Sequence, residues 1–211
     1  APEPFRPHGF KPGAGGNTHY QYDANGNLTQ DAHKGIGIAY NFLNLPMQIT
    51  TPQGNIHFVY DATGRKWAKS GPEGLRWYVD NAEFLDGKIQ HVAFADGRFV
   101  AEYDENGAFQ GTYRAEYFRV DHLGNTRLAF SDFNHDMVIS TRDDPQTPRD
   151  ATEITSENHY YPFGLSHTGP WYASIAPENK YRYNGKEWNA DWGLNMYDYG
   201  ARWYMPDLGR W

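Results

Sequence analysis

Tyr22-Asp23-Ala24-Asn25-Gly26 is the first of three copies of one pattern, Tyr-Asp-x-x-Gly; the others are Tyr60-Asp61-Ala62-Thr63-Gly64 and Tyr103-Asp104-Glu105-Asn106-Gly107. Each copy places an aromatic residue that favours strands just before residues that favour a tight turn, so the pattern predicts a β-hairpin and not a catalytic site. Looser versions at Tyr40-Asn41 and Tyr78-Val79-Asp80 fill the gaps, and the tyrosines at 22, 40, 60 and 78 are 18, 20 and 18 residues apart. Such a period is typical of a repeat array, and arrays usually bind, scaffold or enclose.

The composition indicates that the core is aromatic. Leu, Ile, Val and Phe supply only 36 of 211 residues, a level that would suggest disorder in a highly charged chain. The 16 Tyr, 7 Trp and 12 Phe argue against disorder, because aromatic residues favour strands and bury large areas. We therefore expect an all-β fold.

Turn dipeptides and short alternating runs give the same prediction. Residues 19–22, 56–60, 76–79 and 98–103 each alternate as strands with one aromatic face, and no segment has a convincing helical period. We expect successive hairpins in a long curved or spiralling sheet from about residue 18 to residue 130. Five dipeptides are predicted to adopt positive φ at both positions of two-residue turns: Asn25-Gly26, Asp86-Gly87, Asp96-Gly97, Asn106-Gly107 and Asn184-Gly185.

The remaining boundaries follow from composition. Residues 1–17 are expected to be a linker or strap, since Ala1 to Gly16 hold four prolines and four glycines. Residues 131–158 are polar, contain Pro145 and Pro148, and are predicted to be a loop insertion. Residues 159–211 form a C-terminal segment with a different pattern.

Charge and residue usage exclude several function classes. The net charge is −7 and the 19 basic residues are spread along the chain, which argues against a nucleic-acid partner. No apolar stretch approaches the roughly 18 residues that span a bilayer, and no charged start followed by an apolar core marks a signal peptide. If the protein is exported, we expect its signal to lie outside this chain. The absence of cysteine excludes disulfides, zinc thiolate sites and cysteine nucleophiles.

The later part of the chain carries distinctive motifs. It reads DHLGNTR at residues 121–127, YYPFG at 160–164, NKYRYNGKE at 179–187 and GLNMYDYGARWY at 193–204. Together with the Tyr-Asp repeats, these motifs resemble the YD-repeat proteins and their Rhs repeat-associated core domain, in the form found in Bacteroidetes. The resemblance covers residues from about 18 to 211.

The resemblance implies a container. In the YD-repeat family, hairpins spiral into a hollow cocoon that encloses a variable C-terminal effector, commonly a toxin, and the core domain closes one end. We therefore expect a non-enzymatic shell segment that uses no cofactor and delivers an effector between cells. Its expected partners are the remainder of the shell and the effector, and its expected location is secreted or at the cell surface.

Self-cleavage residues of the family cannot be placed on this chain. Family members continue beyond the Gly-Arg-aromatic sequence into a stretch with catalytic aspartates, whereas this sequence ends at Trp211. It also reads Tyr204-Met205-Pro206 where Tyr-Asp-Pro is common. Asp198 and Asp207 are therefore expected to accept hydrogen bonds at turns or strand ends.

Other catalytic or metal-binding patterns are weak. The nine histidines are scattered without metal-ligand spacing, and His122 beside Asp121 is expected to stabilise a turn. Asp132, Asn134 and Asp136 alternate as in a calcium loop, with Asp143 at the twelfth position. Met137 stands where that loop needs Gly, because Met resists positive φ. The sequence leaves open whether these residues bind calcium or form a solvated acidic loop.

The tryptophans suggest an alternative function. Exposed aromatic rings stack on sugar faces, so a surface array could be a cell-surface glycan-binding or adhesion module. A row of solvent-facing rings at Trp67, Trp77 and Trp171 would favour that reading, whereas rings packed between hairpins would favour the container.

Overall fold

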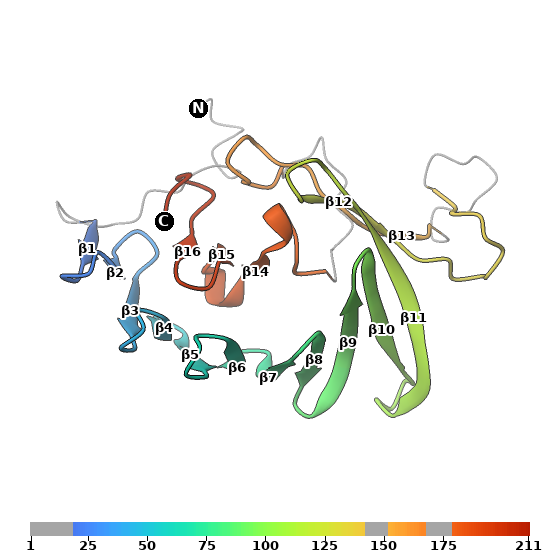
Figure 1. Ribbon diagram of the computed structural model, residues 1–211, viewed down its shortest axis with the longest axis horizontal. Helices are drawn as coiled ribbons and strands as arrows, with labels where there is room; N and C mark the ends of the chain where they lie inside the picture. The colour runs from blue at the N-terminus through green and yellow to red at the C-terminus, as the bar shows by residue number, and fades with distance from the viewer. Residues whose placement is uncertain (1–18, 142–151, 168–178) are drawn as a thin grey trace.

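The computed structural model describes residues 19–141, 152–167 and 179–211, and its regular structure there is almost entirely β. A 13-stranded sheet runs in unbroken chain order from β1 to β13, and a separate three-stranded sheet holds β14 to β16 (Figure 1). The strands of the large sheet are β1 (Tyr20–Tyr22), β2 (Leu28–Asp31), β3 (Ile36–Tyr40), β4 (Pro46–Thr51), β5 (Gly54–Tyr60), β6 (Lys66–Gly71), β7 (Gly74–Val79), β8 (Ala82–Leu85), β9 (Lys88–Phe94), β10 (Gly97–Tyr103), β11 (Phe109–Val120), β12 (Thr126–Phe130) and β13 (Ile154–Glu157). The predicted array of antiparallel hairpins is confirmed.

The Tyr-Asp repeat folds as one turn unit. In the first copy, the amide of Asp23 donates to the carbonyl of Asn27 at 3.0 Å, and the amide of Gly26 donates to the carbonyl of Asp23 at 3.0 Å. Asp23 Oδ1 accepts the amides of Asn25 at 2.9 Å and Asn27 at 2.8 Å. In four further turns the side-chain oxygen of the corresponding residue also accepts the amides two and four residues ahead. These residues are Asn41, Asp61, Asp104 and Asp121.

This geometry corrects most of the predicted turns. Only Asp86-Gly87 forms the predicted two-residue turn, with φ of 48° and 78° between paired Leu85 and Lys88. In the Tyr-Asp units the loop has three residues and only the glycine has positive φ, 83° at Gly26 and 74° at Gly107. The aspartate carboxylate favours this longer loop because it binds amides two and four residues ahead.

Two further dipeptides differ from the prediction. Asn184-Gly185 has φ of 49° and 64°, but it belongs to a three-residue loop between Arg182 and Lys186. Gly97 begins strand β10 without positive φ, and a Cβ there would lie 2.0 Å from the carbonyl oxygen of Glu116. Gly97 is therefore required by the close approach of two strands and not by a turn.

The same loop occurs twice more in the C-terminal segment, without the aspartate. The amide of Tyr161 donates to the carbonyl of Leu165 at 2.8 Å, and that of Arg182 donates to Lys186 at 3.1 Å. In each loop the amide of the glycine donates to the carbonyl of the first residue, as in the Tyr-Asp units. Two motifs that look like a separate signature in sequence are thus hairpin turns of the array type.

The large sheet curves, and the C-terminal segment lies within its concave side (Figure 1). This segment contains β14 (Glu187–Asn189), β15 (Met196–Asp198) and β16 (Trp203–Tyr204), with 3-10 turns η2 (Tyr183–Gly185) and η3 (Asp191–Gly193). Its buried side chains pack against inward-facing residues of β2 to β5. The core cluster contains Leu28, Ile36, Ile38, Ile49, Ile56, Phe58, Leu194, Met196, Trp203 and Met205.

The sheet extends beyond its predicted end. Residues 154–157, expected within the polar loop of 131–158, form strand β13, which pairs antiparallel with β12. Ile154 and Thr155 are β-branched, which favours a strand, but the segment forms one because it pairs with the edge of β12, where Ser156 is fully buried. The predicted linker of residues 1–17 lies outside the described residues. Within the described part of the chain, no helix has the length and apolarity needed to cross a membrane.

Candidate functional site in the charged interior

The inner face of the sheet changes character along the chain. Inward positions of β2 to β5 are mostly apolar, whereas each strand from β6 to β11 contributes a buried ionisable residue. Because side chains alternate across a strand, one face of each strand is directed toward the C-terminal segment. In β6 the register with β5 shifts between Val59 and Tyr60, so that Lys66 and Lys69, three residues apart, both reach this segment. The buried ionisable residues on this wall are Lys69, Arg76, Glu83, His91, Arg98 and Glu116, and Lys66 is nearly buried beside them.

Lys66 joins the wall to the C-terminal segment. Its Nζ lies 2.5 Å from Glu187 Oε2 and 2.6 Å from Asp198 Oδ2. The hydroxyl of Tyr78 donates to the other oxygen of Glu187 at 2.8 Å. Burial opposes charge on Lys66, but Glu187 and Asp198 outweigh it and raise its pKa. Burial likewise raises the pKa of Glu187, but Lys66 lowers it more, to about 2. Both partners are therefore ionised at neutral pH.

A second buried ion pair lies beside the first. Lys69 Nζ and Asp191 Oδ2 are 2.7 Å apart, without the angles of a good hydrogen bond. The next residue, Trp192, packs on Gly54, where a Cβ would lie 2.8 Å from the indole. Turn η3 is thus held to the sheet by charge and by close packing.

Glu83 is the centre of a third cluster. Its Oε2 accepts from Arg76 Nη1 at 2.7 Å, and its Oε1 accepts from the hydroxyl of Tyr181 and lies 3.6 Å from His91 Nε2. Burial lowers the pKa of His91, and this effect exceeds the opposing one of Glu83. His91 is therefore neutral at neutral pH.

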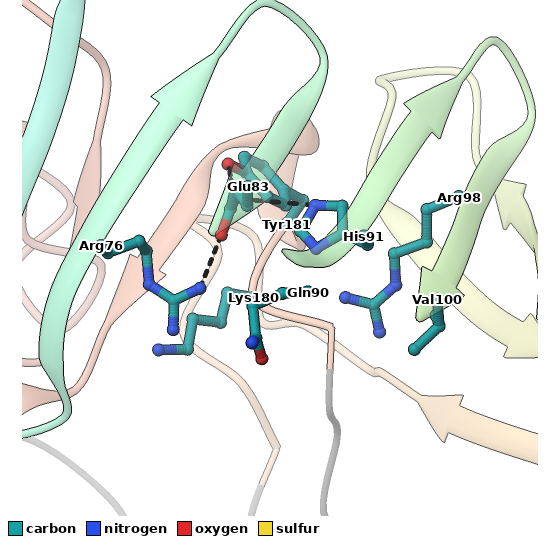
Figure 2. A pocket seen from close by; sticks show the side chains of 8 residues that line it. All are labelled: Arg76, Glu83, Gln90, His91, Arg98, Val100, Lys180 and Tyr181. Carbon is teal, nitrogen blue, oxygen red and sulfur yellow. Dashed lines mark hydrogen bonds and ion pairs between the residues drawn. The ribbon is translucent and has the colours of Figure 1, made fainter. Parts of the chain in front are cut away.

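Two cavities lie on the wall around this cluster. One of about 220 Å³ is lined by Arg76, Glu83, Gln90, His91, Arg98, Val100, Lys180 and Tyr181 (Figure 2). A larger one of about 370 Å³ extends toward Phe118, Val120 and Thr126 and shares Glu83, His91, Arg98 and Tyr181 with the first. Both have polar and apolar lining, which suits a small ligand or ordered water.

The aspartates considered for self-cleavage have structural partners. Asp198 ends strand β15, accepts the amide of Gly200 at 2.7 Å and pairs with Lys66. Asp207 Oδ2 lies 3.6 Å from Lys34 Nζ. Asp121, next to His122, accepts two amides in its turn, and Asn125 of that turn accepts the amide of Asn184 at 2.8 Å.

The candidate calcium loop is closed by its own hydrogen bonds. Asp132 Oδ2 accepts the amide of Met137 at 3.0 Å, and Asn134 Oδ1 accepts the amide of Asp136 at 3.0 Å. The objection drawn from Met137 is wrong, because its φ is 65°. Asp143 lies outside the described residues. Among those described, no three His, Cys, Asp or Glu side chains are grouped to hold a metal ion.

The tryptophans of the alternative function lie on the outer face. Trp67 and Trp77 are 45% and 39% exposed on neighbouring strands β6 and β7. The indole Nε1 of Trp67 donates to Asp61 Oδ2 at 3.1 Å, which fixes the orientation of the ring. Trp171 lies outside the described residues.

Comparison with known proteins gives a structural likeness only. No family model and no curated protein matches the sequence. The chain is similar to crystal structures of TcdB2-TccC3, with a TM-score of 0.62, 19% identity and coverage of 90% of this chain and 10% of the other. A structure titled TcdB2-TccC3-Cdc42 matches with a TM-score of 0.63 and 19% identity over 90% of this chain and 9% of the other.

The likeness establishes the fold. The chain shares its all-β fold, a long sheet of antiparallel hairpins, with part of these solved structures. It spans about a tenth of the length of the solved chains that it matches.

Sequence reasoning missed the charged wall. Lys66, Arg98 and Glu116 were not singled out, although Arg76 and Arg98 stand in runs predicted to be strands. Charged residues at alternate positions of several neighbouring strands are the signal that could have found them. From the sequence alone, such positions are interpreted as a solvent-exposed face, because nothing shows that the C-terminal segment covers them.

Proposed function

We propose that this chain is a wall segment of a Rhs/YD-repeat toxin shell that encloses an effector polypeptide for delivery between cells. The observation that carries the proposal is the curved sheet of 13 strands in chain order. A sheet built this way lengthens by adding hairpins at its end and needs no new type of contact. This segment acts through structure and not through catalysis, and we place it in a secreted or surface-exposed particle.

The edges of the sheet support a role within a larger wall. Strands β1 and β13 each have one neighbour among the described strands. Unpaired strand edges favour pairing with further strands, so a wall segment is expected to be continued on both sides. The solved chains that this protein resembles are about ten times longer, which agrees with such a continuation.

The interior supports a fixed and not a mobile C-terminal segment. Three clusters, centred on Lys66, Lys69 and Glu83, join the wall to residues 181–198. Separating a buried ion pair leaves a buried charge without its partner, which is energetically costly. These pairs therefore fix the position of the segment. We propose that this segment seals one region of the shell.

The proposal is tested by limited proteolysis of the longer polypeptide encoded by the same gene. We expect the effector portion to survive as a protected fragment at protease levels that degrade it when it is produced alone. A Lys66→Met variant should weaken protection, whereas Arg119→Gln, which changes an exposed residue of β11, should not. Equal degradation of the enclosed and the isolated effector would refute the container.

A second candidate is glycan binding at the outer face, favoured by the half-exposed rings of Trp67 and Trp77. Aromatic platforms of this kind stack on sugar rings, and Asp61 would add a hydrogen-bond acceptor. Screening the chain on a glycan array, with Trp67→Ala and Trp77→Ala as variants, tests this function. Trp211→Ala is the control, because Trp211 is equally exposed but lies against Tyr204. Absence of binding, or binding that survives both variants, excludes the platform.

A further inference from the structure

The cavity beside Glu83 has more cations than carboxylates in its lining. Arg76, Arg98 and Lys180 line it, and Glu83 is the single carboxylate among its lining residues. We propose that this cavity binds a small oxyanion of the carboxylate or phosphate type, held by Arg98 on one side and by Arg76 and Lys180 on the other. The proposal does not depend on the shell function.

Arg98 has a buried hydrogen-bond donor that is not used within the described structure. Its side chain is 7% exposed, its Nε donates to Glu116 Oε2 at 2.5 Å, and its Nη2 has no hydrogen-bond partner. A buried guanidinium N–H without an acceptor is costly, so an added acceptor would be favourable. Figure 2 shows the guanidinium of Arg98 directed from β10 toward the middle of the cavity.

Arg76 and Lys180 complete the positive side. Arg76 donates to Glu83 by Nη1 and to Glu73 by Nη2, at 2.7 and 3.0 Å, and its Nε has no partner. Lys180 Nζ also binds Glu73. In Figure 2 the two guanidinium groups approach from opposite sides with Gln90 between them, and the ammonium group of Lys180 lies on the side of Arg76. Planar guanidinium forks match the oxygens of carboxylate and phosphate groups.

The cations around the cavity are already paired, so a ligand has to use the donors that these pairs leave free. Glu73 and Glu116 neutralise the cations from outside the lining, and His91 is neutral because burial lowers its pKa. Glu83 is paired with Arg76 and Tyr181, so three carboxylates match the three cations. A bound oxyanion would therefore accept from the nitrogens that these pairs leave without a partner, Arg98 Nη2 and Arg76 Nε. At about 220 Å³ the cavity has space for several water-sized groups, each of about 30 Å³ in the liquid.

The test is calorimetric titration of the 211-residue chain with inorganic phosphate and, separately, with acetate, at constant ionic strength set with sodium chloride. We expect saturable heat with at least one of these probes. The double variant R98Q/E116Q removes the cation without leaving Glu116 unpaired, and should raise the dissociation constant about tenfold or more. K180Q changes a partly exposed residue and should raise it by a smaller factor. R119Q removes one positive charge from an exposed position on the opposite face of β11 and should leave it unchanged.

The two probes separate the sources of the ligand. Saturation by phosphate alone indicates a phosphate site, and saturation by acetate indicates a site for carboxylates, including those of acidic side chains. If R98Q/E116Q does not fold, K180Q decides the question. No saturable heat with either probe, or heat that none of the cavity variants changes, overturns the proposal. The container function is unaffected by either result.

Discussion

Lys66 Nζ and Asp198 Oδ2 lie 2.6 Å apart although 132 residues separate them in the chain. Lys66 begins strand β6 of the wall, and Asp198 ends strand β15 of the enclosed segment. With Glu187 on the same ammonium group, the contact closes the C-terminal segment onto the sheet. Buried charges of this kind are tolerated only as a complete set, since each needs its partner to offset desolvation.

The first prediction concerns the loss of that ammonium group. Lys66→Met should lower the free energy of unfolding by about 3–5 kcal/mol, because Glu187 and Asp198 would remain buried without a cation. Urea denaturation measures the change. Lys88→Met, at an exposed hairpin position, is the matched control and should cost far less. An equally small loss in both variants would mean that the Lys66 cluster does not stabilise the fold.

The second prediction is a pH dependence. The pKa of Glu187 is about 2 in the folded chain against an ordinary value of 4.5, since Lys66 outweighs the effect of burial. A depressed carboxyl pKa contributes stability that is fully present above about pH 4.5 and is lost as the pH falls toward 2. Unfolding free energies of the wild type and Glu187→Gln should therefore converge across this interval. A constant difference between the two proteins from pH 6 to about pH 2 would contradict the assignment.

The third prediction concerns the turn unit. Gly107 has φ of 74°, so Gly107→Val should cost on the order of 1 kcal/mol or more through backbone strain. The nearest atom to an added Cβ is the flexible Nζ of Lys88, at 2.9 Å, so crowding is a minor part of the cost. Gly107→Asn is the control, because Asn tolerates positive φ. Thermal unfolding should rank the wild type first, Asn second and Val last.

The fourth prediction tests the packing of the enclosed segment. Leu194 is 1% exposed and lies in the core cluster with Ile49 and Ile56. Leu194→Ala should cost about 2–5 kcal/mol by lost burial and cavity formation. Leu123→Ala, at a site 57% exposed, should change stability by no more than about 0.5 kcal/mol. If both substitutions have equally small effects, the C-terminal segment is not part of the core.

The repeated part of the fold could be predicted because its signals are local. The hydrogen bonds of each turn join residues within one short stretch, as those from Asp104 to Ala108 illustrate, and the tyrosine, the acceptor side chain and the glycine that mark it stand within five residues. The loop length was predicted incorrectly, because Asn106-Gly107 alone does not show that Asp104 binds the amide of Ala108. Strand β13 was missed because its polar sequence, Ile-Thr-Ser-Glu, pairs only where β12 offers an edge.

The charged interior could not be predicted in the same way. Arg98 and Glu116 are 18 residues apart on neighbouring strands, and Tyr181 reaches Glu83 across 98 residues. The alternation of side chains along a strand does not show which face of the sheet another segment will cover. A charged side chain is buried only on the face that such a segment covers. The unpartnered nitrogen of Arg98 is visible only once its neighbours are in place.

The sequence by itself determined the antiparallel hairpins, their order and the all-β class, because turn chemistry and strand propensity act within a few residues. The tertiary structure alone decided that the sheet curves around its own C-terminal segment. It also decided that Lys66, Lys69, Glu83 and Arg98 face inward, since burial and ion pairing depend on segments far apart in the chain. The hairpin array follows from repeated local contacts, whereas the charged site forms only where the curved sheet encloses the C-terminal segment.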